Sequence, residues 1–188
     1  MGLNHTMNLA EILSQMQPTK HKVFVSYHHG GDQGYYDQFA RIFASTYDVI
    51  TDTSLHDPIN SDNADYVMQR IRQDYITGSS CTIVLCGRET PWRKYVDWEI
   101  KATLDKEHGL IGVNLPTNLV SANNTYTVPD RLHDNIVSKY AVWTDWRTVT
   151  ADLATLPALI QQAKTRPANM IINNREMLSR NLQPPWRS

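Results

Sequence analysis

Five short apolar runs alternate with segments of helical periodicity over most of this sequence. The runs are rich in β-branched and aromatic residues, which favour strands. They cover residues 22–27, 47–52, 81–86, 110–115 and 140–144. The segments between them repeat apolar residues every three or four positions, as one face of a helix does. They cover residues 32–46, 64–75, 94–107 and 131–137. This alternation predicts a parallel sheet with helices packed on both of its faces.

The same order of elements is typical of a flavodoxin-like α/β fold, a three-layer sandwich around a central five-stranded parallel sheet. The crossovers between its strands are expected to be right-handed. Both ends of the chain depart from the alternation. Residues 8–17 have helical spacing and predict an N-terminal helical extension over residues 1–20. The fold domain then covers 21–146, and 147–188 form a C-terminal helical appendage on it, with Pro157 in a first turn or at a kink.

Composition excludes several function classes. The 188 residues include 18 basic and 19 acidic residues. The resulting net charge of −1 gives the chain no overall positive potential that would attract nucleic acid or an anionic membrane. No apolar run approaches the ~20 residues of a membrane span, so we expect a soluble protein. With two cysteines and no export-signal pattern at the start, we expect it in the cytoplasm. Residues 164–188 carry five basic side chains and one acidic side chain. This basic tail is either a solvated appendage, held by Ile171, Ile172, Met177 and Leu182, or a surface for an acidic partner.

The chain has two cysteines, Cys81 and Cys86, in one predicted strand. Side chains five residues apart on a strand point to opposite faces, so these thiols are not expected to pair with each other. Two thiols cannot complete a four-ligand zinc site, and the adjacent His28 and His29 point in different directions, so we expect no metal site. Cys86 is expected to be a small buried residue rather than a nucleophile, because no activating base lies near it in sequence.

Polar and aromatic residues gather where the predicted strands end. Ligands of doubly wound sheets bind beyond the carboxyl ends of the strands, beside the first strand. The residues delivered there are Ser26, Tyr27, His28, His29, Asp52 and the segment 86–92. The stretch HHGGDQG after the first strand does not match the dinucleotide fingerprint, and no phosphate-binding P-loop, HExxH or GxSxG motif occurs in the chain. The sequence therefore indicates a site at this edge without a standard motif.

The segment 90–100, which reads TPWRKYVDWEI, is the most suggestive part of that edge. If it is helical from Lys94, then Tyr95 and Glu99 lie four residues apart on one face. A carboxylate with an aromatic ring one turn earlier, flanked by apolar residues, suits a sugar or a flat ring. The alternative is a surface glutamate on an amphipathic helix, and spacing alone leaves both interpretations open.

Several motifs occur in a recognisable order along the chain. They are FVSYH at 24–28, ITD at 50–52, TIVL at 82–85 and the helix from Trp92 that ends in Trp98 and Glu99. This ordered set resembles the Toll/interleukin-1-receptor (TIR) domains, particularly the bacterial TIR-like group. It is similar to the TIR-like component of the Thoeris anti-phage defence system. The resemblance covers residues 21–146, and the tail around 172–175 also fits that group.

Enzymes of this family cleave the nicotinamide–ribose bond of NAD⁺, and some make a cyclic ADP-ribose-like signal that activates a separate effector protein. The resemblance therefore implies that NAD⁺ is a substrate, that no cofactor is needed, and that the chain self-assembles. It implies that Glu99 is the catalytic residue. It also implies that Tyr95 lines the pocket. The residues that follow the first two strands are expected to complete the substrate-binding set, and they are Ser26, Tyr27, His28, His29 and Asp52.

Two other functions remain open at this point. Many TIR domains are non-catalytic modules that only bind other TIR domains, and nucleoside-processing hydrolases or transferases also use a flavodoxin-like sheet with one glutamate. A carboxylate at position 99 favours an enzyme over a pure interaction module, which has no use for that group.

Overall fold

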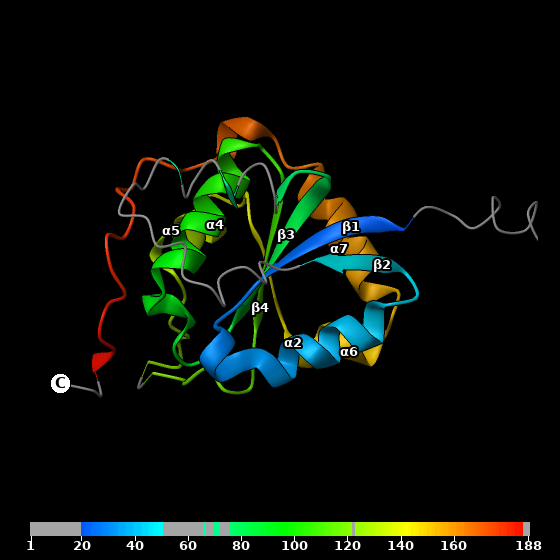
Figure 1. The fold of residues 1–188 in the computed structure, drawn as a ribbon, viewed down its shortest axis with the longest axis horizontal. Coiled ribbons are helices and arrows are strands. Elements are labelled where there is room, and N and C mark those ends of the chain that lie inside the picture. The colour runs from blue at the N-terminus through cyan, green and yellow to red at the C-terminus, as the bar shows by residue number, and fades with distance from the viewer. Residues whose placement is uncertain (1–19, 51–65, 67–69, 72–75, 122, 186–188) are drawn as a thin grey trace, which may run out of the picture.

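The chain folds around a five-stranded sheet in which every pair of neighbouring strands is parallel (Figure 1). This computed structural model describes residues 20–50, 66, 70, 71, 76–121 and 123–185. The strands are β1 (His21–Ser26), β2 (Tyr47–Ile50), β3 (Ser79–Cys86), β4 (Gly109–Asn114) and β5 (Val142–Asp145). Their order in the sheet is β2-β1-β3-β4-β5, which is the flavodoxin-like order, so the predicted fold class is confirmed.

The described α-helices are α2 (His29–Phe43), α4 (Lys94–Asp105), α5 (Asp130–Val137), α6 (Trp146–Ala151) and α7 (Thr155–Lys164). The helices α2, α4 and α5 overlap the predicted helices over 32–46, 94–107 and 131–137, and α7 and all but the first residue of α6 lie in the predicted C-terminal appendage. Two short 3₁₀ helices, η3 (Thr90–Trp92) and η4 (Ala168–Met170), complete the described elements. The predicted N-terminal helix over 8–17 and most of the predicted helix over 64–75 lie outside the described residues.

Helix α2 begins at His29, three residues earlier than Asp32, where the sequence pattern predicts its start. Gly30 and Gly31 are part of its first turn. They leave room for the His28 imidazole, because a Cβ atom on Gly30 or on Gly31 would lie 3.1 Å from that ring. A larger residue at either position would therefore require the His28 ring to shift.

Strand β5 begins at Val142, two residues later than predicted. The preceding residues still belong to the turn that ends α5. Lys139 has a φ of 70°, and the Ala141 N–H donates to the Asn135 carbonyl over 2.8 Å. Tyr140 is buried all the same, and its hydroxyl donates to the His108 carbonyl at 2.8 Å.

Helices cover both faces of the sheet (Figure 1), and each face carries an apolar core. One core lies beneath α2, α6 and α7 and includes Phe39 and Leu156. The other lies beneath α4 and α5 and includes Ile100 and Leu132. Pro157 occupies the third position of α7, so it sits in the first turn, where a missing N–H costs nothing. Because α7 packs on β3, β4 and β5, it completes one layer of the sandwich.

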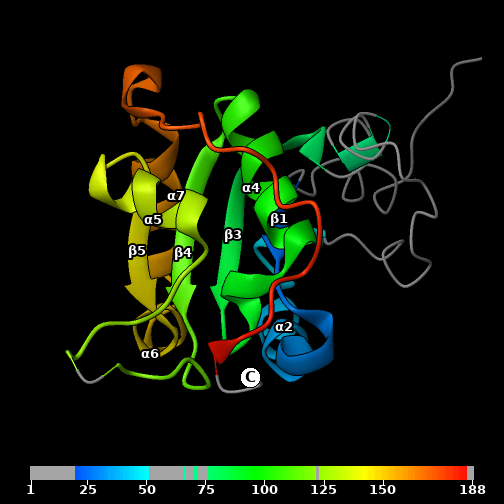
Figure 2. The same cartoon turned by 90° about the vertical axis from the view of Figure 1, so that its left-hand side faces the viewer.

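Beyond η4, residues 171–184 run alongside α4 without helix or strand (Figure 2). We call residues 171–185 the C-terminal strap. The predicted helical appendage therefore ends in an extended segment. Of its four predicted anchors, Ile171 and Met177 pack against the cores, whereas Ile172 and Leu182 are 37% and 43% exposed.

Side chains from the body hold the strap in this extended form. Arg131 is fully buried and bonds to the Asp97 carboxylate through Nε at 2.8 Å. Its Nη1 donates to Asn173 Oδ1 at 2.8 Å, and its Nη2 donates to the carbonyls of Arg175 and Glu176 at 3.1 Å each. Backbone groups that a helix would pair within itself are here paired with a buried guanidinium.

Replacing Arg131 by alanine should therefore destabilise the protein strongly, because Asp97 would be left as an uncompensated buried charge. We expect Arg131→Ala to lower the free energy of unfolding by about 3–5 kcal/mol in urea titrations. The control is Arg175→Ala, which removes the exposed ion pairs of Arg175 with Asp130 and Asp134. That change should cost no more than about 1 kcal/mol. Equal effects of the two substitutions would contradict this account of the strap.

Candidate functional site

The structure gathers five of the predicted site residues around one cavity of about 200 Å³. The cavity lies at the carboxyl edge of the sheet, between the segment that follows β1 and the first half of α4. Its lining residues are Tyr27, His28, His29, Gly30, Arg93, Tyr95, Val96, Glu99 and Asn181. We call this cavity the Glu99 pocket.

Helix α4 delivers the acidic wall of the pocket. It starts at Lys94, directly after η3, so Tyr95 and Glu99 fall one turn apart on the side that faces β1. Glu99 is only 3% exposed. Tyr95 is fixed by an edge-on contact with Trp98, with ring centroids 5.5 Å apart. A buried carboxylate beside an ordered aromatic ring thus lines the cavity.

The segment after β1 delivers an aromatic wall. The Tyr27 ring stacks on Tyr36 with centroids 4.7 Å apart and lies 4.2 Å from the ring of His29. Its hydroxyl donates to Gln33 Oε1 at 2.8 Å. Burial, reinforced by the nearby Tyr36, raises the pKa of Tyr27 above its ordinary value. The phenol therefore stays protonated at neutral pH and adds no charge to the pocket.

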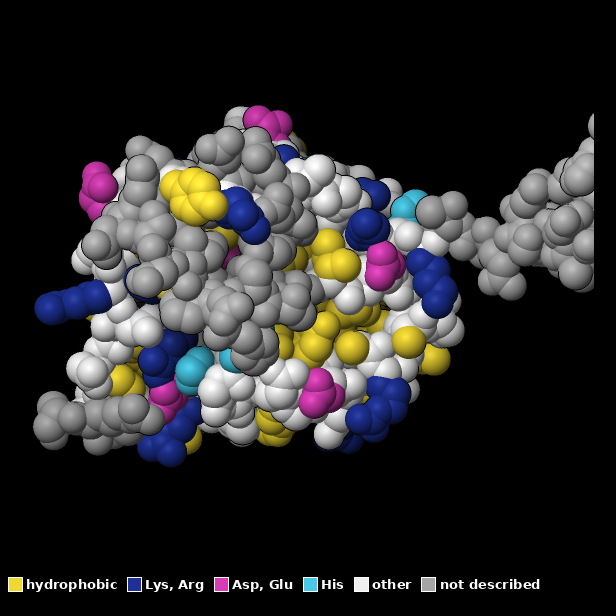
Figure 3. Space-filling view, in the orientation of Figure 1, with side chains coloured by type: hydrophobic (Ala, Val, Ile, Leu, Met, Phe, Trp, Pro, Cys, Tyr) yellow, Lys and Arg dark blue, Asp and Glu magenta, His cyan; other side chains and the backbone are white. Residues whose placement is uncertain are grey.

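One carboxylate links two of the polar residues that line the pocket. Glu89 Oε2 lies 3.5 Å from His28 Nε2, and the same oxygen pairs with the Arg93 guanidinium. Figure 3 shows histidine, basic and acidic side chains gathered at the N-terminal end of α2. A shared anionic partner holds both side chains in place and offsets the charge of Arg93.

The remaining two predicted residues do not join this group in the described structure. Ser26 ends β1 with a side chain that is 1% exposed, so it does not line the cavity. Its Oγ has no hydrogen-bond partner among the described residues. Asp52 lies outside the described residues.

Sequence reasoning missed two polar residues of the pocket. Arg93 stands immediately before α4, inside the segment 90–100 that the sequence singles out, so its position was available. Asn181 comes from the C-terminal strap, and no local signal connects it with a helix 87 positions earlier in the chain.

The cysteines and histidines of the described residues form no metal site, because no cluster of three or more His, Cys, Asp or Glu side chains suits an ion there. Cys81 and Cys86 are free and lie in the two opposite cores. Burial raises the pKa of Cys81 to about 12 and that of Cys86 further still. Neither thiol is a nucleophile at neutral pH, because both stay protonated.

A second cavity of about 490 Å³ adjoins the Glu99 pocket and shares His28 and Gly30 with it. Its floor contains Asp32, which is 2% exposed. The Asp32 carboxylate accepts hydrogen bonds from the hydroxyls of Thr90, at 3.0 Å, and Thr117, at 3.2 Å. Burial raises the pKa of Asp32 although these hydrogen bonds act in the opposite direction. Asp32 thereby ties the start of α2 to the loops that follow β3 and β4.

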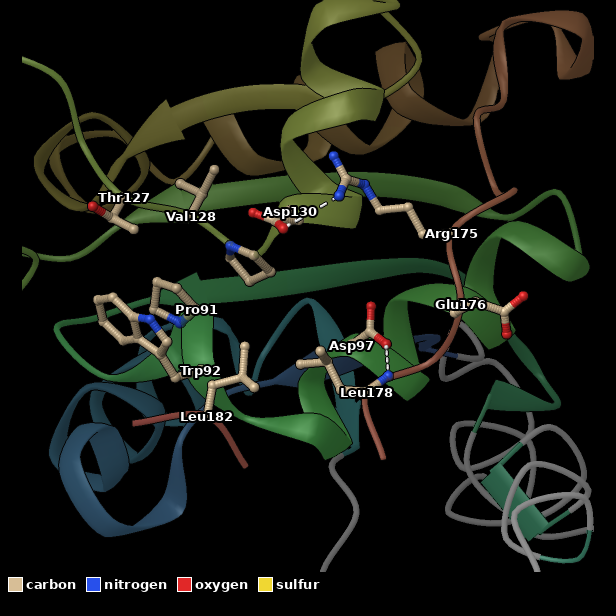
Figure 4. A pocket seen from close by; sticks show the side chains of 11 residues that line it. Pro91, Trp92, Asp97, Thr127, Val128, Asp130, Arg175, Glu176, Leu178 and Leu182 are labelled. Atoms are coloured by element: carbon tan, nitrogen blue, oxygen red, sulfur yellow. Dashed lines mark hydrogen bonds and ion pairs between the residues drawn. The ribbon is translucent and has the colours of Figure 1, made fainter. Parts of the chain in front are cut away.

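A third cavity, of about 410 Å³, lies beneath the strap beside η3 (Figure 4). Its walls are mainly apolar and include Trp92 and Leu182. Two of its carboxylates already have partners within the protein. Asp97 accepts a hydrogen bond from the Leu178 N–H at 3.0 Å, and Asp130 forms an ion pair with Arg175. The chemistry therefore points to the Glu99 pocket rather than to this larger cavity.

Fold and site together define the class of protein. A five-stranded parallel sheet in this order, with a pocket at its carboxyl edge that Glu99 lines, defines a flavodoxin-like α/β domain with a candidate ligand site. The family model described as "Thoeris protein ThsB, TIR-like domain" matches residues 24–119, which is half of the chain. The chain belongs to this family of ThsB TIR-like proteins.

The chain is also similar to a solved structure, the TIR domains of the activated Roq1 resistosome directly recognizing the pathogen effector XopQ. The identity is 12% and the TM-score is 0.38, over 80% of this chain and 83% of that one. A comparison with curated protein sequences finds no match. Within the described part of the chain, no helix is long and apolar enough to span a membrane.

The buried Asp32 carboxyl predicts a pH effect on stability. A pKa that is higher in the folded than in the unfolded chain contributes stability at low pH, and this contribution is lost as pH rises through the folded value. Relative to Asp32→Asn, the wild type should therefore gain on the order of 1 kcal/mol of unfolding free energy between about pH 7.5 and about pH 4.5.

Urea titrations of both proteins across that range measure the difference between their unfolding free energies. Titratable groups that the two proteins share contribute equally to both and cancel in this difference. The matched control is Asp48→Asn, at an exposed position on β2, which should run parallel to the wild type. A wild-type advantage that shrinks on acidification would contradict the raised pKa of Asp32.

Proposed function

We propose that this protein cleaves the nicotinamide–ribose bond of NAD⁺ and that Glu99 is its catalytic residue. The observation that carries the proposal is the Glu99 pocket itself. A glutamate that is 3% exposed lines a cavity together with Tyr27 and Tyr95, in a chain of the ThsB TIR-like family. Aromatic walls suit a flat ring, and a carboxylate suits the cation that forms when this ring departs.

The proposed step balances with one carboxylate. The bond between ribose C1′ and the pyridinium nitrogen breaks, and its electron pair leaves with nicotinamide, which departs as a neutral molecule. The ribose becomes oxocarbenium-like, and the Glu99 carboxylate stabilises its positive charge or holds its hydroxyl groups. No general acid is required, because nicotinamide departs as a neutral molecule and needs no proton.

The size of the pocket bears on how the substrate would lie. At about 200 Å³, the Glu99 pocket is smaller than cavities that enclose drug-sized ligands, which measure roughly 300–1,000 Å³. We propose that it takes the nicotinamide–ribose half of NAD⁺. The adjoining cavity of about 490 Å³, which shares His28 and Gly30, offers room for the remainder.

The nature of the acceptor would decide the product. Water as the acceptor gives hydrolysis, whereas a nucleophile from the same substrate molecule gives a cyclic product. We propose a cyclic ADP-ribose-like product that acts in the cytoplasm as a diffusible anti-phage signal and activates a separate effector protein. The ThsB family membership supports this proposal. We also propose that the chain self-assembles.

Replacing Glu99 by glutamine should abolish turnover while leaving the fold intact, because the amide keeps the shape and removes the charge. We expect Glu99→Gln to lower the rate of nicotinamide release by at least about 100-fold. Mass spectrometry of the nucleotide products, from purified protein and from lysates of phage-infected cells, measures both the rate and the product. The matched control is Glu107→Gln, at an exposed position beyond the far end of α4.

Full turnover by Glu99→Gln would remove Glu99 from the reaction. Absence of nicotinamide release from the wild type in both preparations would contradict the enzyme and favour a non-catalytic interaction module. Linear ADP-ribose as the only product would leave the cleavage step standing and overturn the cyclic signal.

A further inference from the structure

The C-terminal strap contributes one residue to the Glu99 pocket, Asn181. This residue lies 62 positions beyond the last residue of the family match, which covers 24–119. It reaches the pocket because the strap runs alongside α4 (Figure 2). The pocket therefore has a wall that the TIR-like segment does not supply.

Asn181 caps α4 from a distance. The first N–H groups of a helix need acceptors from outside it, and the residue at the N-cap position, Arg93, makes no side-chain cap. The Lys94 N–H instead donates to Asn181 Oδ1 at 3.0 Å. This bond also fixes which way the amide points, because only its oxygen can accept from an N–H.

Anchors on both sides hold Asn181 in this position. On one side, the Leu178 carbonyl accepts from Trp98 Nε1 at 2.8 Å, and the Leu178 N–H donates to the Asp97 carboxylate at 3.0 Å. On the other side, the Leu182 N–H donates to the Trp92 carbonyl at 3.0 Å. A side chain between two fixed points loses little further freedom when it binds a ligand.

The amide nitrogen of Asn181 remains available. Within the described part of the chain, the hydrogen bond to Lys94 is the one interaction of this side chain, and it uses the oxygen. The Nδ2 group therefore brings two donor hydrogens to a pocket that Glu99 also lines.

We propose that Asn181 is a substrate-binding residue whose Nδ2 donates a hydrogen bond to an oxygen of the nicotinamide–ribose half of NAD⁺. This inference rests on the proposed function and extends it to the strap. One amide then performs two tasks, since its oxygen fixes the start of the catalytic helix and its nitrogen holds the substrate. The binding site accordingly requires the chain as far as residue 181.

Two substitutions separate the two tasks. Asn181→Asp keeps the acceptor for Lys94 and removes the donor, whereas Asn181→Ala removes both. If Nδ2 binds substrate, both variants should bind NAD⁺ roughly 5- to 10-fold more weakly than the parent protein. Only Asn181→Ala should melt earlier, by about 2–4 °C, because a carboxylate also caps a helix N-terminus.

The measurement is calorimetric titration of NAD⁺ into Glu99→Gln protein, which binds without turnover, with and without the second substitution. Asn174→Asp is the matched control, since it makes the same chemical change at an exposed strap position away from the pocket, and its affinity should equal that of the parent. Titrations at low and high salt separate the lost donor from charge repulsion, because only repulsion is screened.

The outcomes are distinct. Parent affinity in Asn181→Asp, or a defect that disappears at high salt, would overturn the inference and leave Asn181 as a helix cap alone. The proposed function would then stand. Absence of NAD⁺ binding to the parent protein, together with absence of nicotinamide release by the wild type, would overturn the proposed function and this inference together.

Discussion

The fully buried guanidinium of Arg131 is the group that joins α4 to the C-terminal strap. A buried cation needs a counter-charge and acceptors for its remaining hydrogens. Arg131 obtains the Asp97 carboxylate from α4, and it obtains an amide oxygen and two carbonyls from the strap. The backbone carbonyls of an extended strap can accept these hydrogen bonds, because they are not paired within a helix. The charge and the strap therefore stabilise each other.

This interaction reaches the Glu99 pocket through α4. Asp97 and Glu99 lie two positions apart, so their side chains leave the helix in different directions. Asp97 turns toward the strap and Arg131, whereas Glu99 turns toward the pocket. The strap then returns to the start of the same helix through Asn181. One helix thus connects the structural ion pair to the acidic pocket.

Local sequence patterns predict the strands of the sheet and part of the Glu99 pocket. The strands follow from β-branched runs, and the gathering of Tyr27 and Glu99 follows from where parallel strands end. The rest depends on contacts that no local pattern carries. The His28 ring packs against Gly30 in the first turn of α2, and the strap is extended because a buried arginine binds its carbonyls. A guanidinium inside the core is invisible in the sequence, where Arg131 resembles any polar residue of an amphipathic helix.

The chain is close to neutral overall, and charges of opposite sign are also paired at the Glu99 pocket. Glu89 pairs with both Arg93 and His28, so the cation nearest to the pocket is already offset. In the basic tail, Arg175 is bound to Asp130 and Asp134 of the same chain, which favours an internal clamp over a surface for an acidic partner. A dianionic substrate would therefore gain little from a long-range field and must be held by short contacts. Recognition at this pocket then depends on ring stacking, the Glu99 carboxylate and fixed donors, and these are the groups that a buried helix and a pinned strap can position.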